Sequence, residues 1–296
     1  MKKLSFLMLA LGCCIFASAQ DGSFLLYSFK GNVAVVENKT ETKAKVGKML
    51  NNAATIKVSS GAAVTLICNE SAMFTISKPG TYSLNQFGDS CKVSNSSLTA
   101  NYVKYVWAQM TKSGGSAGSD RKKYMNTVGA VSRSVNNIWI DPRLDTVNYA
   151  GGEFPLSWKS YADAKEFEFS LYNGSAKPLY KTTTNKKKIS IPKFASQLKA
   201  GSSYTWTAAV KGEQNDETKV LNYVSKETFD QLLADFKSQA TYESPAEESY
   251  RIAFMLEDAH YLSEAYQYYT KAATAAPDNP LYRSTLMSFK KDYELK

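Results

Sequence analysis

The chain has 296 residues, of which 44% are hydrophobic, and it carries a formal net charge of +9. This length exceeds one ordinary hydrophobic core, so two or three domains are expected. The only histidine is His260, and every Ser-His-Asp or Cys-His catalytic arrangement would depend on it. The sequence also lacks the H-E-x-x-H, G-x-S-x-G, phosphate-loop and dinucleotide-binding motifs. The composition therefore predicts no catalytic residues, no cofactor and no metal site.

Residues 1–19 have the pattern of a secretory signal peptide. Lys2 and Lys3 precede an apolar run over 4–16, and a small-x-small cleavage site ends at Ala19. Loss of the two lysines would lower the net charge to +7. We expect export across the inner membrane to the periplasm or the outer cell surface, with a lipid anchor at Cys13 or a buried N-terminal helix as alternatives.

The positive net charge does not indicate that the chain binds nucleic acid, because an exported protein rarely meets nucleic acid and the lysines are spread along the chain. The one run, 186–188, is expected at a solvated turn, where a weak affinity for anionic surfaces remains open. No later apolar run reaches the length of a membrane span, so no transmembrane segment is expected.

Short β-branched runs closed by Gly, Asn, Ser or Lys predict a series of strands between Gly31 and Leu84. The runs cover residues 31–37, 46–50, 54–58, 62–68, 72–77 and 81–84, with Pro79-Gly80 as a turn. Cys68 and Cys91 are the two cysteines outside the signal peptide. In an oxidising compartment they are candidates for a disulfide, with two buried free thiols as the alternative.

This stretch resembles the FecR-type domain. The matching positions are Gly31 and Val33, Gly47 and Leu50, Ile56 and Val58, and Ser60-Gly61-Ala62 leading into Val64, Leu66 and Cys68. Signalling members of that family also have a cytoplasmic segment and a membrane span that pass signals to a sigma factor, and neither is expected here. The resemblance covers about 31–93 and implies a FecR-like β domain, which we expect over 21–111 together with the helix that follows it.

A change of pattern follows the first β domain. Residues 98–110 place apolar side chains at helical spacing, and this helix is expected to pack back on the first β domain. Residues 112–136 begin with Gly and Ser and have no apolar anchors, which predicts a flexible linker.

Strands are expected again over 137–224. The run 165–172 alternates strictly, with Phe167, Phe169 and Leu171 on one face and Glu166 and Glu168 on the solvated face. Further strands are expected at 153–158, 178–183, 188–191, 204–210 and 219–224.

This segment resembles fibronectin type III and related immunoglobulin-like modules, a resemblance carried by Trp158, Leu198, Gly201, Tyr204 and Trp206. It implies a β-sandwich in which Tyr204 occupies the position of a tyrosine corner.

The pattern becomes helical over 225–296. Phe229, Leu232, Leu233 and Phe236 form one stripe, and Ser244-Pro-Ala-Glu247 predicts a capping box. Helices are then expected over 246–259, 262–275 and 280–292.

The pair of helices from 246 to 275 resembles a tetratricopeptide repeat. Ala253, Leu256, Ala265, Tyr269, Ala272 and Pro277 match that family's spacing, and His260 stands where the family has glycine. One repeat cannot bury its own face, so this tail is expected to dock on a neighbour. Tyr261, Tyr266 and Tyr268 are the candidate partner contacts, with a small helical core as the alternative.

The sequence therefore predicts a multidomain, mainly β protein with an α-helical C-terminus. We expect a non-catalytic envelope module that binds a protein partner or a glycan. Two alternatives stay open: a FecR-like periplasmic sensor or signalling accessory, and a carbohydrate-active enzyme that uses carboxylates.

Overall fold

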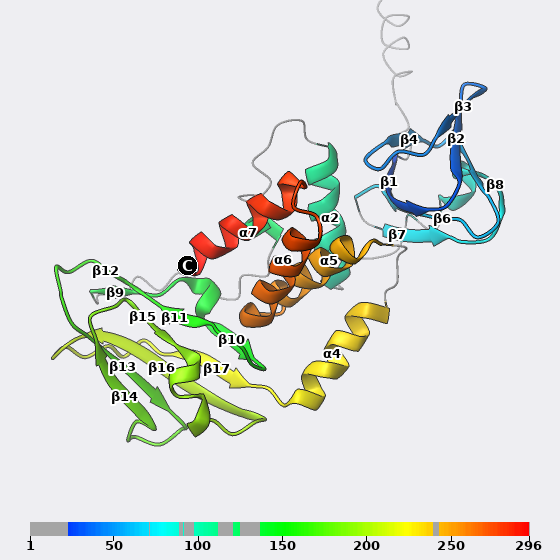
Figure 1. Ribbon diagram of the computed structural model, residues 1–296. Helices are drawn as coiled ribbons and strands as arrows, with labels where there is room; N and C mark the ends of the chain where they lie inside the picture. Colours follow the sequence, from blue (N-terminus) through cyan, green and yellow to red (C-terminus); the bar gives the residue numbers. More distant parts are fainter. Residues whose placement is uncertain are drawn as a thin grey trace, which may run out of the picture. The chain divides into compact units, whose positions relative to one another are not determined.

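The computed structural model describes residues 23–70, 72–88, 91, 98–111, 121–124, 137–238 and 243–295 (Figure 1). The predicted signal peptide, including Cys13, and most of the predicted linker lie outside these residues. The chain divides into two compact units, Met1–Ser94 and Asn95–Lys296. Antiparallel sheets form the first unit, mainly antiparallel sheets form the centre of the chain, and most of the helices lie toward the C-terminus.

Unit 1 consists of two four-stranded antiparallel sheets, with strand orders β4-β1-β6-β7 and β3-β2-β5-β8. Its elements are β1 (Ser23–Lys30), β2 (Val33–Glu37), β3 (Thr40–Lys43), β4 (Met49–Asn51), β5 (Thr55–Val58), β6 (Ala63–Cys68), β7 (Ala72–Ile76), β8 (Gly80–Ser83) and the short 3-10 helix η1 (Leu84–Phe87). The predicted strands are confirmed, and β1 and β3 are additional.

One core joins the two sheets of unit 1. Phe24 and Leu66 from the first sheet lie in the same buried cluster as Val35 and Ile56 from the second. The β1–β2 turn needs a glycine at position 31, where φ is +73° and a Cβ would lie 3.0 Å from the Cα of Ala62.

Cys68 ends β6, and Cys91 follows η1. Their Cα atoms are 5.4 Å apart and their sulfur atoms are bonded. The bond ties the segment after η1 to a fully buried strand.

Unit 2 begins with α2 (Leu98–Thr111), and this helix packs on a later helix, α5 (Pro245–Asp258). The hydroxyl groups of Tyr105 and Tyr250 are 2.6 Å apart, and the ring of Tyr105 stacks on Phe254. The expectation that this helix packs on the first β domain is therefore wrong. Its apolar stripe was predicted correctly, but helical spacing does not specify which neighbour covers the stripe.

The next part of unit 2 is the central β-region, which we define as residues 137–224. Its elements are β9 (Ile138–Trp139), η4 (Pro142–Leu144), β10 (Thr146–Tyr149), β11 (Pro155–Ser157), β12 (Lys159–Ser160), β13 (Phe167–Tyr172), β14 (Tyr180–Thr184), β15 (Lys188–Ser190), η5 (Ile191–Lys193), η6 (Ala195–Gln197), β16 (Ser202–Val210) and β17 (Lys219–Tyr223). One sheet has the order β10-β17-β16-β13-β14, and two smaller sheets pair β11 with β15 and β12 with β9. All pairs are antiparallel except β10 with β17.

Aromatic rings fill the core between these sheets. Phe169 of β13 stacks on Trp158, Phe194 and Trp206 with ring centroids 5.6 to 6.3 Å apart. The buried face of β13 agrees with the predicted alternation. Tyr204 accepts a hydrogen bond of 2.7 Å from the backbone N–H of Lys199, the bond expected of a tyrosine corner.

The helices that follow are α4 (Lys226–Ser238), α5, α6 (Leu262–Ala275) and α7 (Pro280–Asp292). They confirm the predicted tail to within a residue or two. The capping box at Ser244 and Glu247 is present in both directions because each side chain bonds the other residue's backbone N–H. α5 packs along α6, and α7 packs on α6.

We expect Cys68 and Cys91 to be bonded in the purified protein. Denatured, unreduced protein should show no reactive thiol, and reduction should lower the free energy of unfolding of unit 1 by roughly 3 kcal/mol, because the opened loop regains chain entropy. Thiol labelling with mass spectrometry and denaturant melts measure both effects. Two labelled thiols before reduction would contradict the bond.

Candidate functional site

A buried ionic network lies where the helices of unit 2 meet the central β-region. Arg121 of η3 (Arg121–Tyr124) donates to Glu257 of α5 at 2.7 Å and to Asp292 of α7 at 2.9 Å. The side chains of the three residues are 0%, 1% and 8% exposed. Arg143 of η4 forms ion pairs with Asp141 and, at 3.3 Å, with Asp292. The network therefore joins η3, α5 and α7 to the β-region.

Two tyrosines complete the network. Tyr269 donates to Glu257 at 2.9 Å and Tyr293 donates to its other oxygen at 3.2 Å. Burial raises the pKa of both hydroxyl groups well above 10, so they stay protonated donors. Burial, the largest single effect, would lower the pKa of Arg121, but Glu257, Tyr269, Tyr293 and Asp292 together outweigh it and the pKa is raised. These charges stabilise one another and hold the elements in register.

Position 121 lies inside the predicted flexible linker, and that part of the prediction is wrong. Residues 121–124 form a short helix, and the side chain of Arg121 is fully buried. The composition of this stretch does not reveal the buried arginine, because the carboxylates that pair with it are 136 and 171 residues away. No local pattern in the sequence could have identified the pairing.

A second polar joint connects α6 with the turn after β10. Glu264 accepts hydrogen bonds from the backbone N–H groups of Ala150 and Gly151 at 2.8 and 2.9 Å. Ser263 donates to the carbonyl of Gly151 at 2.7 Å. At Gly152, where φ is +88°, a Cβ would lie 2.8 Å from the Ser263 hydroxyl, so only glycine allows this approach. These bonds confirm that the tail docks on a neighbouring part of the chain.

Burial raises the pKa of Glu264 to about 7, against the effect of the hydrogen bonds from Ala150 and Gly151. Its Oε2 is buried and has no hydrogen-bond partner among the residues that the structure describes. The carboxyl group is therefore held in a place that favours its protonated form.

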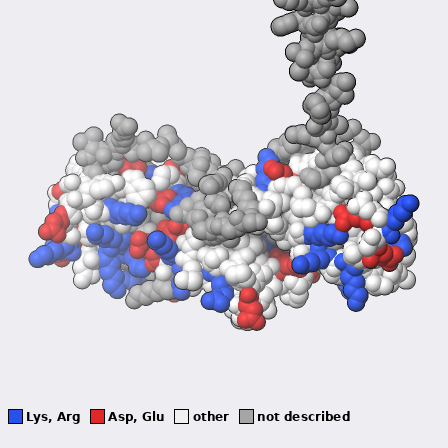
Figure 2. All heavy atoms as spheres, turned by 90° about the horizontal axis from the view of Figure 1, so that it is seen from above, with Lys and Arg blue, Asp and Glu red and all other residues white. Residues whose placement is uncertain are grey.

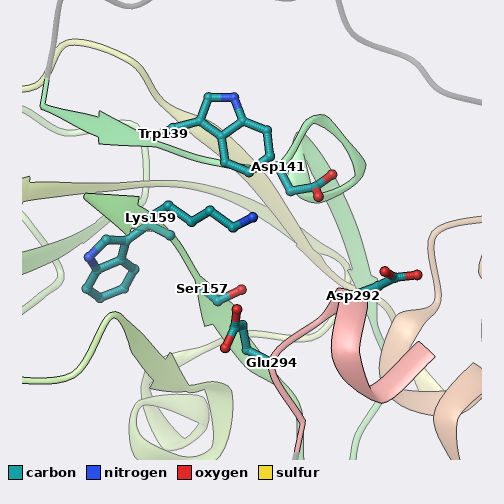
Figure 3. A pocket seen from close by; sticks show the side chains of 7 residues that line it. Trp139, Asp141, Ser157, Lys159, Asp292 and Glu294 are labelled. Carbon is teal, nitrogen blue, oxygen red and sulfur yellow. The ribbon is translucent and has the colours of Figure 1, made fainter. Parts of the chain in front are cut away.

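A small pocket lies beside the ionic network (Figure 3). Its lining consists of Trp139, Asp141, Ser157, Trp158, Lys159, Asp292 and Glu294. The ammonium group of Lys159 lies 5.0 Å from the centre of the Trp139 ring, and Figure 3 shows the Glu294 carboxylate pointing toward Ser157. The cavity volume is about 10 Å³, which is room for about one water molecule.

A larger groove adjoins this pocket and shares Glu294 with it. We call it the Tyr266 groove; its volume is about 280 Å³, and it is lined by Glu153, Phe154, Pro155, Lys188, Ser190, Tyr266, Glu294 and Leu295. The half-buried Tyr266 ring stacks on Phe289, 6.2 Å away and tilted by 11°. Ser190 donates to Glu153 at 2.9 Å on the opposite wall. The groove thus offers an aromatic ring with a carboxylate, a hydroxyl and an ammonium group around it, which suits a polar chain more than a purely apolar ligand.

The structure does not bring the three candidate contact tyrosines together. Tyr266 lines the groove. Tyr261 is only 8% exposed and packs on Phe229 of α4. For this residue the structure therefore agrees with the alternative expectation, that its ring belongs to a small helical core. Tyr268 lies beside Lys271, whose ammonium group is 4.3 Å from the ring centre. Of the three, only Tyr266 lies at a described groove.

His260 lies at the α5–α6 turn with φ of +62°, the conformation that glycine adopts readily. Its carbonyl accepts a hydrogen bond from Asn148 N–H at 2.9 Å, and burial lowers the pKa of its imidazole. No group of three or more metal-binding side chains occurs among the described residues.

Comparison with protein-family models and with curated protein sequences finds no match for this chain. None of the helices within the described ranges is both long enough and apolar enough to cross a membrane.

Replacing Arg121 with Met should lower the free energy of unfolding by about 3–5 kcal/mol, because Glu257 and Asp292 would stay buried without their shared cation. Arg283→Met, on the exposed face of α7, is the matched control and should change stability by less than about 0.5 kcal/mol. Urea melts of both variants measure this. Equal effects would contradict a structural role for the network.

Glu264 should make stability depend on pH. Its folded pKa of about 7 exceeds the ordinary value of 4.5, so the folded state binds the proton more tightly, and stability should fall as pH rises from about 4.5 to 7. The loss is of order 3 kcal/mol at most. In Glu264→Gln this loss should disappear, leaving the variant more stable relative to wild type at pH 8 than at pH 5. Melts across this range measure it, and parallel curves for the two proteins would contradict the assignment.

Proposed function

We propose that the chain is a non-catalytic, exported envelope protein that serves as a binding or scaffold module and takes its partner in the Tyr266 groove. The observation that carries this proposal is the groove itself, which places a half-buried aromatic ring beside Glu153, Lys188 and Ser190. The partner we favour is a protein segment, and a glycan is the other ligand that the same stacking and hydrogen-bonding groups would suit.

Three local features support the domain families proposed for this architecture. The two-sheet core of unit 1 with its turn glycines supports a FecR-like domain. The hydrogen bond to the Tyr204 hydroxyl supports a fibronectin-like sandwich in the central β-region. The positive φ of His260, at the family's glycine position, supports a tetratricopeptide-like helix pair. All three families act chiefly as sensing, spacing or docking modules, which agrees with a non-catalytic role.

The rival proposal, a carbohydrate-active enzyme, would need a pair of carboxylates in a cleft that admits a sugar. Asp141 and Asp292 do lie together at the small pocket. Both, however, form ion pairs with Arg143, and Asp292 also pairs with Arg121, so both carboxylates are already engaged by guanidinium groups. The cavity there also has room for only about one water. These observations favour binding over hydrolysis.

A photo-crosslinking amino acid placed at position 266 should capture one defined partner in cells that express the chain with its predicted signal peptide. Tyr161, which is 75% exposed and does not line the groove, is the matched control position. We expect an adduct from position 266 that is absent from position 161 and is weakened by Lys188→Glu, because that change reverses the charge on the groove wall. The same adducts from both positions, or none from position 266, would contradict the proposed binding site.

A further inference from the structure

The central β-region contains a long stretch that is basic throughout. Between residues 169 and 212 the sequence has eight lysines and no Asp or Glu. We define the basic edge as six of these lysines, all exposed: Lys177, Lys181, Lys186, Lys187, Lys193 and Lys199. Lys188 is left out because it lines the Tyr266 groove and donates to the carbonyl of Glu294.

The fold places four of these lysines, Lys177, Lys181, Lys186 and Lys187, on the edge strand β14 or just beyond its two ends. β14 is the edge strand of the five-stranded sheet, and β15 belongs to a smaller sheet, so the chain passes from one sheet to the other between them (Figure 1). Lys181 lies on β14, Lys186 and Lys187 form the connection, and Lys193 ends η5. A five-residue strand spans roughly 17 Å, so the charges extend over more than one Debye length at physiological salt. In Figure 2 several blue side chains lie over the β-region, on the left, with red ones interspersed among them.

Most of these charges have no partner within the described part of the chain. Lys181 forms an ion pair with Glu168 at 3.0 Å, with the lysine 52% exposed. The ammonium groups of the other five form no ion pair or hydrogen bond with a described residue, whereas the exposed Lys211 is paired with Glu166. Unpaired cations on the exposed surface give this part of the β-region a positive potential, which attracts an external polyanion.

The residue type indicates what kind of anion fits. The basic edge contains only lysine, whose ammonium group is a mobile point charge, and no arginine, whose fork suits bidentate recognition of a single phosphate. Scattered flexible cations on an exposed edge match a broad surface of fixed negative charges better than a shaped pocket for one ligand. We propose that the basic edge docks the protein on a membrane surface that displays anionic phosphate headgroups.

Vesicle co-sedimentation of the full chain without residues 1–19 tests this proposal. The protein should sediment with vesicles of phosphatidylglycerol in phosphatidylcholine, stay in solution with phosphatidylcholine alone, and be released by high salt. Each lysine near an anionic surface contributes about fivefold to affinity. The triple variant Lys186→Glu, Lys187→Glu and Lys193→Glu should therefore bind at least about a hundredfold more weakly.

A second triple variant, Lys43→Glu, Lys45→Glu and Lys78→Glu, makes the same change in net charge at exposed lysines of unit 1, none of which belongs to the basic edge. It should bind nearly as well as wild type. Equal loss of binding in both variants would show that net charge alone acts and would overturn the proposal. Binding to soluble polyphosphate or heparin without binding to vesicles would also overturn it, in favour of a linear polyanion. None of the substituted lysines lines the Tyr266 groove, so the crosslinking result there is independent of this outcome.

Discussion

The burial of the Arg121 guanidinium is the constraint on which the second unit depends. A charge removed from water must be paired, and this one meets Glu257 from α5 and Asp292 from the end of α7. Neither carboxylate can move away without leaving a buried charge uncompensated. Asp292 also pairs with Arg143, which belongs to the central β-region, so one set of charges fixes the helices to each other and to the strands.

The joint at Glu264 acts at a second place on the same interface. α6 approaches the turn after β10 closely enough that only glycine fits at position 152, and the Glu264 carboxylate satisfies two backbone donors there. Two separate attachments leave little freedom for a hinge between helices and strands. The Tyr266 groove lies at this interface, with one wall from α6 and the other from β11 and β15, so its shape follows from how firmly the two parts are held.

The sequence predicted what local patterns can specify. The capping box at Ser244, the buried face of β13 and the bounds of the last three helices follow from periodicity and turn chemistry, and the structure agrees with them. What it could not predict depends on contacts between distant residues. The helix 98–111 has a clear apolar stripe, but only the fold shows that Tyr105 meets Tyr250. Arg121 sits in a stretch whose composition indicates a linker, and its partners are more than a hundred residues away. Likewise, Tyr261, Tyr266 and Tyr268 are equivalent in the sequence, and tertiary packing separates the buried ring from the one at the groove.

The central claim is that the helices and the central β-region form one cooperative unit. The chain has four tryptophans, and in a Trp107→Phe variant the remaining three, Trp139, Trp158 and Trp206, all lie in the central β-region. Tryptophan fluorescence would then report unfolding of the strands, and far-ultraviolet circular dichroism would report the helices. If the two parts are held together as described, both signals should change at the same urea concentration. Helices that melt at a clearly lower concentration than the strands would contradict the claim.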